Sequence, residues 1–80
     1  MKVGEAARLR ILELCEENSI TVNKLATLSG LTQSTLNNIV SGRNRSVTLV
    51  TVKKICDGLD ISLQTFFRSP CFEHLEQEVQ

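Results

Sequence analysis

The chain has 80 residues, of which nine are Lys or Arg and nine are Asp or Glu, so its formal charge is zero. This length limits the chain to one domain, and a hydrophobic content of 41% is enough for a single small core. No apolar run approaches the roughly 18 residues that would span a bilayer, and the N-terminus lacks the pattern of a secretory signal, so the sequence predicts a cytoplasmic protein.

The charges are segregated along the chain. Residues 1–18 carry three basic and four acidic side chains, residues 19–56 carry five basic and no acidic ones, and residues 57–80 carry one basic and five acidic ones. The three segments therefore sum to −1, +5 and −4. Because the positive field of residues 19–56 is not cancelled locally, this segment is a candidate face for an anionic partner.

Apolar residues recur at helical intervals throughout the chain, which predicts an all-α fold of about five short helices. The first helix is expected from Glu5 to Asn18, because its apolar residues share one side. These residues are Ala7, Ile11, Leu14 and Cys15. Leu9 and Leu12 point elsewhere and leave a second, smaller apolar patch.

Hydroxyl side chains that can accept backbone N–H bonds mark the starts of the following helices. The expected N-caps are Thr21, Thr32, Thr48 and Ser62. Gly30 is expected to end the second helix and Gly42 the third, while the reversal after the fourth falls on Gly58 or Asp60. The apolar positions at helical spacing are Val22, Leu25, Ala26 and Leu28 in the second helix, Leu49, Val52, Ile55, Cys56 and Leu59 in the fourth, and Leu63, Phe66 and Phe67 in the fifth.

Pro70 should stop the fifth helix, so we expect a domain over residues 1–69 and a tail or short weak helix over residues 70–80. The apolar residues of this tail have two interpretations. They cover the first helix within one chain, or they form the seam of a homodimer. The residues concerned are Leu9, Leu12, Phe72, Leu75 and Val79.

The second and third helices have the spacing of a helix-turn-helix. Ala26 is small where the two helices cross closely, and Gly30 makes the tight turn between them. Leu36 and Ile39 then anchor the later helix on the earlier one and on the core.

The third helix, Gln33 to about Ser41, has one core side and one uncharged polar side. Its core side is expected to hold Thr35, Leu36, Ile39 and Val40. Amide side chains pair bidentately with the major-groove edge of adenine, and hydroxyls meet several base edges. The polar strip therefore predicts four base-reading residues, Gln33, Ser34, Asn37 and Asn38.

Phosphate contacts are expected around this helix. The N-termini that follow the three Thr caps each offer a partial positive charge. The loop after the third helix adds basic and amide side chains. The predicted phosphate-contacting residues are Thr21, Thr32, Arg43, Asn44, Arg45 and Thr48, with Lys24, Lys53 and Lys54 adding to the field.

The sequence lacks the sets of residues that a metal site or a catalytic site would need. Cys71 and His74 form a C-x-x-H pair, but a zinc site needs about four ligands, so no metal is expected. The three Cys are odd in number and irregularly spaced, which fits small buried hydrophobes. There is no nucleophile with a base and no phosphate-cradling Gly-rich loop, so we predict no catalysis, cofactor or small-molecule ligand.

The sequence resembles the XRE or Cro-repressor type helix-turn-helix domains of phage repressors and small bacterial regulators, over roughly residues 7 to 68. The anchors are Ile11-x-x-Leu14, Leu25-Ala26, Ser29-Gly30-Leu31, Ser34-Thr35-Leu36, Ile39-x-x-Gly42, Thr48-Leu49 and the run from Ile55 to Phe67. The resemblance implies a compact five-helix bundle of the lambda-repressor-like type that binds operator DNA, commonly as a dimer.

The resemblance also implies roles for individual residues. It places base reading on Gln33, Ser34 and Asn38, and loop contacts on Arg43 and Arg45. Val22 stands where members often have a Gln that contacts the DNA backbone or an end base, so this clamp is expected to be weaker here.

Our first hypothesis is a sequence-specific regulator of transcription, a repressor or autoregulator, that binds double-stranded DNA. The alternative is an antitoxin or protein-interaction adaptor, for which the tail and the first-helix patch would matter more than residues 33–38. The acidic ends of the chain predict weak nonspecific DNA binding and a modest salt dependence.

Overall fold

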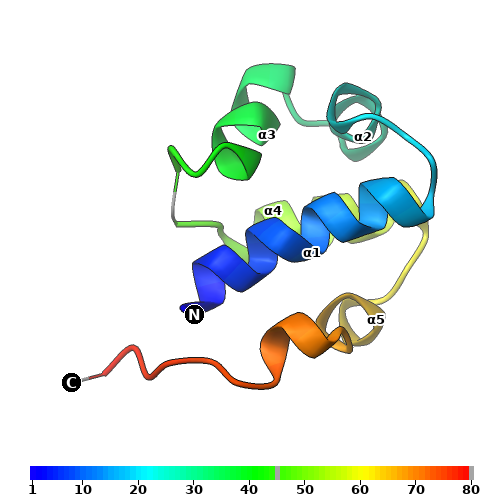
Figure 1. The fold of residues 1–80 in the computed structure, drawn as a ribbon. Helices are drawn as coiled ribbons and strands as arrows, with labels where there is room; N and C mark the ends of the chain where they lie inside the picture. The colour runs from blue at the N-terminus through cyan, green and yellow to red at the C-terminus, as the bar shows by residue number, and fades with distance from the viewer. Residues whose placement is uncertain (45, 80) are drawn as a thin grey trace.

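The computed structural model describes residues 1–44 and 46–79, and within them it holds helices and no strand (Figure 1). The elements are α1 (Val3–Glu17), α2 (Val22–Ser29), α3 (Gln33–Val40), α4 (Leu49–Leu59), α5 (Leu63–Phe67) and a short 3₁₀ turn, η1 (Pro70–Phe72). The predicted all-α, five-helix fold is confirmed. None of these helices, in the ranges described, is long and apolar enough to cross a bilayer.

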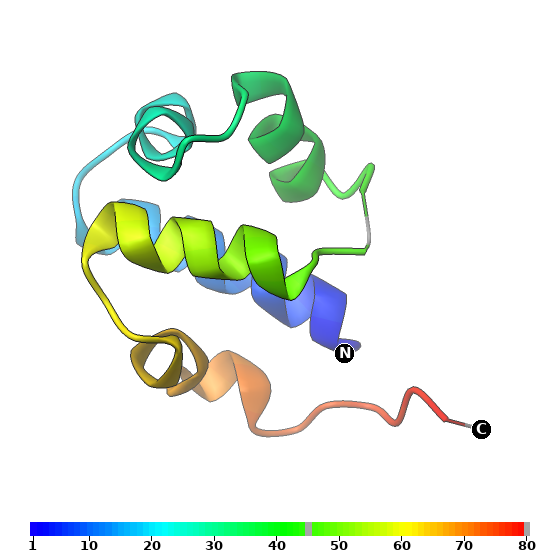
Figure 2. The same ribbon diagram turned by 180° about the vertical axis from the view of Figure 1, so that it is seen from behind.

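The helices form three layers, which the two opposite views in Figures 1 and 2 both show. α2 and α3 form one outer layer, α1 and α4 occupy the middle layer with one in front of the other in both views, and α5 with the C-terminal segment forms the other outer layer. The core lies between the layers. Its largest fully buried side chains are Ile11, Leu25, Leu36, Ile39, Ile55, Cys56 and Phe66.

One joint design recurs at three points of the chain. A residue in the left-handed conformation follows the end of a helix, and the next residue packs its side chain against the core. The residue after that caps the next helix. In each joint the middle residue donates its N–H to a carbonyl five residues earlier. The joints are Ser19-Ile20-Thr21, Gly30-Leu31-Thr32 and Asp60-Ile61-Ser62, with φ of 54°, 68° and 55° at their first residues.

The four predicted N-caps all hold in the structure. Each hydroxyl oxygen accepts the backbone N–H of the residue three positions later, at 3.0 to 3.1 Å. The capped helices are those that follow Thr21, Thr32, Thr48 and Ser62. The reversal after α4, which the sequence left open, falls on Asp60.

Gly58 has a different role, at the crossing of α2 and α4. A Cβ atom at this position would lie 2.8 Å from the Leu28 carbonyl oxygen and 2.8 Å from the Ser29 Oγ. Real Cβ atoms do not approach this closely, so the absence of a side chain lets the two helices touch. The contact at Gly58 therefore determines how closely the α2–α3 layer packs against the middle layer.

Arg10 joins α1 to α5 from inside the protein, with only 6% of its surface exposed. Its Nε donates to the Phe66 carbonyl at 2.7 Å and its Nη2 to the Thr65 carbonyl at 2.9 Å. Nη1 is paired with Glu13, and Glu17 lies 3.8 Å away. The Phe66 carbonyl lies at the end of a five-residue helix and accepts no other hydrogen bond from the described residues, whereas the Thr65 carbonyl also accepts the Arg68 N–H at 3.3 Å.

Several residues expected in the core lie at its edge. Leu49 is 72% exposed, because Val47 before the cap and Val52 in the next turn occupy the core instead. Thr35 is exposed too, since it lies in the first turn of α3 beside the capping hydroxyl of Thr32. Leu63 and Phe67 are also partly exposed, so Phe66 alone is fully buried in α5.

The C-terminal segment returns to the start of α1. After η1 it runs without further helix, and the Glu76 N–H donates to the Met1 carbonyl at 3.0 Å. Phe72 packs on Phe66 and Phe67 with ring centroids 6.0 and 4.9 Å away. Within the predicted seam, Leu9, Leu12, Phe72 and Leu75 are half-buried by the chain itself, and Val79 is 83% exposed.

Candidate nucleic-acid interface

The start of α3 presents two free polar side chains. Gln33 and Ser34 are exposed, and neither side chain makes a hydrogen bond to another residue that the structure describes. The Thr32 cap fixes the backbone beneath them, so the two side chains project from an ordered first turn. They can donate to or accept from a partner without breaking any contact of the fold.

Asn38 differs from the predicted strip because it is half-buried. Its backbone carbonyl accepts the Asn44 N–H at 3.0 Å and the Ser41 hydroxyl at 3.2 Å. These bonds tie the following loop to α3. Its side-chain amide has no partner among the described residues, so both the oxygen and the nitrogen are available to a ligand.

Asn37 is not free in the same way. Its Nδ2 donates to the Gln33 carbonyl at 2.8 Å and to the Oδ1 of Asn23 at 3.0 Å. Asn23 lies in the first turn of α2, so this amide pair connects the two helices of the unit. Sequence reasoning missed Asn23, although an exposed amide in the turn that faces α3 was a signal that could have pointed to it.

The three Thr residues predicted to contact phosphate all serve as caps, so their oxygens already accept a backbone N–H. The Thr32 and Thr48 hydroxyls also bond the hydroxyls of Thr35 and Thr51, at 2.7 and 3.1 Å. Thr21 makes no such second bond within the described residues. At Thr32 and Thr48, the free backbone donors are therefore the N–H groups of the two residues that follow each cap, since the third is bonded to the cap hydroxyl.

Two described residues of the loop after α3 are joined by a bond within the loop. Gly42 takes a φ of 85°, and the Asn44 Oδ1 accepts the Ser46 N–H at 3.0 Å, which leaves the Asn44 nitrogen to act as a donor. Arg43 is exposed. The prediction for Arg45 lies outside the described residues.

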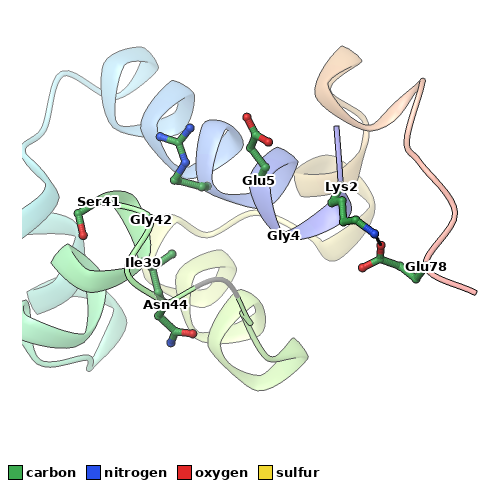
Figure 3. A pocket seen from close by; sticks show the side chains of 9 residues that line it. Lys2, Gly4, Glu5, Ile39, Ser41, Gly42, Asn44 and Glu78 are labelled. Carbon is green, nitrogen blue, oxygen red and sulfur yellow. Dashed lines mark hydrogen bonds and ion pairs between the residues drawn. The ribbon is translucent and has the colours of Figure 1, made fainter.

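Figure 3 shows a hollow between the start of α1, the end of α3 and the C-terminal segment. Its lining mixes both signs of charge, with Lys2 bonded to Glu78 at 3.4 Å and Glu5 and Arg8 nearby. Ile39, Ser41, Gly42 and Asn44 line the side that belongs to α3 and its loop. The hollow thus places basic and acidic side chains of α1 and the C-terminal segment opposite the loop that follows α3.

The charge segregation seen in the sequence persists in the fold. The α2–α3 layer carries no Asp or Glu, whereas α1 and the C-terminal segment carry seven. Lys53 of α4 is paired with Asp57, and this hydrogen bond raises the pKa of Lys53. One of the five basic charges in residues 19–56 is therefore directly compensated.

The buried cysteines carry no reactive chemistry of their own at neutral pH. Burial raises the pKa of Cys15 and of Cys56, so both thiols stay protonated. Both pack in the core cluster, in agreement with their interpretation as small hydrophobes.

Comparisons with known proteins agree with this geometry. The model of the Cro/C1-type helix-turn-helix DNA-binding domain matches residues 10–70, which include all five helices apart from the first turns of α1. The crystal structure of the prophage Lp1 protein 11 superimposes with a TM-score of 0.78, at 38% sequence identity, over 94% of this chain and 100% of that one. No curated protein matches the sequence. With a family match across most of its length and a prophage protein as a structural neighbour, the chain belongs to the family of Cro/C1-type helix-turn-helix DNA-binding domains.

Proposed function

We propose that this protein is a sequence-specific regulator of transcription that inserts α3 into the major groove of double-stranded DNA. The observation that carries the proposal is the set of unbonded polar side chains on α3. The side chains of Gln33, Ser34 and Asn38 make no hydrogen bond to the described residues, so no hydrogen bond of the fold is lost when they bind a partner. Side chains of this kind are suited to base edges, which differ in their donors and acceptors.

Phosphate contacts come from the surroundings of α3 in this proposal. Arg43, the free nitrogen of Asn44 and the first N–H groups of α2, α3 and α4 are donors that a phosphate oxygen can accept. The acidic residues lie on the other layers, so they do not oppose the approach of DNA at short range. Affinity then depends on few phosphate contacts, and log K should fall gently with log salt, by about 0.9 for each contact.

Selection of binding sites from random duplex DNA at two salt concentrations tests the proposal. If Asn38 reads a base, Asn38→Ala should cost about 1 to 3 kcal/mol on the selected site and relax the preference at one position. Arg43→Ala should instead weaken all sequences alike and lower the salt slope. Equal losses on selected and scrambled DNA for both variants would rule out base reading by α3.

We also propose that two copies bind a symmetric operator, since helix-turn-helix domains of this type commonly read two half-sites about one helical turn apart. The partly exposed edge of the α1 and C-terminal patch, ending at Val79, is the surface offered for this contact. Measuring the molecular mass of the protein in solution and on the selected duplex tests whether two copies bind. A protein that stays monomeric at high concentration and on DNA would remove the dimer.

A further inference from the structure

We propose that Asn23 is a positioning residue that makes Asn37 a reader of amino groups only, so that Asn37 selects adenine or cytosine over guanine or thymine at one strand position. The proposal rests on the function proposed above. Asn23 belongs to α2, and its side chain reaches Asn37 of α3 across the helix-turn-helix unit. A single exposed side chain on one helix thereby sets the hydrogen-bonding capacity of the next.

The orientation of both amides follows from one contact. A backbone carbonyl only accepts hydrogen bonds, so the Asn37 atom that lies 2.8 Å from the Gln33 carbonyl oxygen must be the nitrogen. The Asn23 atom that lies 3.0 Å from the same nitrogen must then be an acceptor, which is its Oδ1. The two amide orientations are therefore determined by the helix backbone.

The same contacts use up the donors of Asn37. An amide nitrogen has two hydrogens, and Gln33 and Asn23 take one each. What Asn37 keeps is its Oδ1, which accepts no hydrogen bond from any residue in the described ranges. Asn37 is exposed, so this oxygen needs a donor from outside the chain.

DNA supplies that donor in one form. Phosphate oxygens are acceptors and repel a carbonyl oxygen, so Asn37 is matched to bases. On the major-groove edge the amino groups of adenine and cytosine donate, while the corresponding oxygens of guanine and thymine accept. Asn38, whose amide is unbonded, keeps the capacity for bidentate pairing that Asn37 has lost.

The experiment is binding-site selection from random duplex DNA with the full chain, followed by affinities on the selected duplex and on its three variants at the position that Asn37→Ala identifies. Asn23→Ala gives Asn37 a free N–H, so the preference for adenine or cytosine at this position should fall by about fivefold or more. Asn23→Asp keeps an acceptor for Asn37. It should retain the preference, while its added negative charge lowers affinity for every sequence.

Thr27→Ala is the matched control, because Thr27 is exposed one turn along α2 and bonds only the carbonyl of its own helix. It should leave the preference unchanged. Combining Asn23→Ala with Asn37→Ala should add nothing to Asn37→Ala alone. Urea unfolding of each variant verifies that it is folded during the assay.

The possible outcomes distinguish failure of the Asn23 proposal from failure of the proposed function. A selected motif whose preference at this position is the same for wild type and Asn23→Ala overturns this proposal and leaves the proposed function standing. A preference for guanine or thymine at the Asn37 position overturns it as well. A wild-type protein that enriches no sequence overturns both, because Asn37 then reads no base.

Discussion

The α2–α3 layer and the layer formed by α5 with the C-terminal segment make opposite use of polar groups. In the first, the side chains of Gln33, Ser34 and Asn38 on α3 make no hydrogen bond to the described residues, and no acidic residue is present. In the second, Arg10 is buried to bond two carbonyls of α5, three Phe rings pack together, and acidic residues cover the surface. The difference predicts that Gln33, Ser34 and Asn38 can change without loss of the fold, because the bonds that hold the fold together lie elsewhere.

The largest expected effect separates stability from recognition. Arg10→Met keeps the volume of the side chain but removes both of its charged hydrogen bonds to α5 and leaves the Phe66 carbonyl without a donor, while the Thr65 carbonyl keeps the Arg68 N–H. This should cost about 2 to 4 kcal/mol of unfolding free energy. Urea unfolding followed by circular dichroism measures it. Arg8→Met is the matched control, because Arg8 reaches only the Val40 carbonyl, at 3.5 Å. A loss of unfolding free energy below about 1 kcal/mol for Arg10→Met would contradict the stabilising role of Arg10. A changed base preference in the folded variant would contradict the separation of stability from recognition.

A second variant acts where α2 packs on α4 of the middle layer. In Gly58→Ala the added Cβ meets the Leu28 carbonyl, so α2 must move away from α4, at a cost of about 1 to 3 kcal/mol. Because α2 carries α3 with it, affinity for the selected duplex should fall as well, which a binding titration would detect. Asp57→Ala, at an exposed position beside it, should change stability by less than about 0.5 kcal/mol. Loss of stability with unchanged DNA affinity would show that this contact does not hold the α2–α3 layer in place for DNA binding.

The smallest effect concerns the thiols. Cys71 is half-exposed and should react first with iodoacetamide, while Cys15 and Cys56 react only when the chain opens. Mass spectrometry of labelling over time measures this, and Arg10→Met should accelerate the two buried sites.

The same thiols give a pH dependence of small size. Burial raises the pKa of Cys15 and Cys56 in the folded protein, so the unfolded chain ionises first as pH rises. The contribution of these two thiols to the free energy of unfolding is complete below the ordinary pKa of a thiol and is lost as the pH rises above it. Unfolding free energies at alkaline pH should decline less in Cys15→Ala than in the wild type, each compared with its own value at neutral pH.

Local chemistry made much of the fold predictable. The caps at Thr21, Thr32, Thr48 and Ser62 appear where an exposed hydroxyl precedes a helical pattern, because the orphan N–H groups of a helix need a nearby acceptor. The helix-turn-helix could be predicted because Gly30 is the residue that tolerates its turn most easily. The polar strip and the segregated charge are likewise properties of the order of residues along the chain.

Only the tertiary structure determined where residues of similar type differ in conformation, burial or hydrogen bonding. Ser19 and Asp60 take the left-handed conformation without being glycine, because Ile20 and Ile61 after them are drawn onto the core. Leu49 is left outside since Val47 and Val52 fill the space. Asn37 and Asn38 look alike in the sequence, yet one is bonded to α2 and the other is free. Spacing along a helix determines which side a residue takes, but only the packing of helices determines which groups find a partner there.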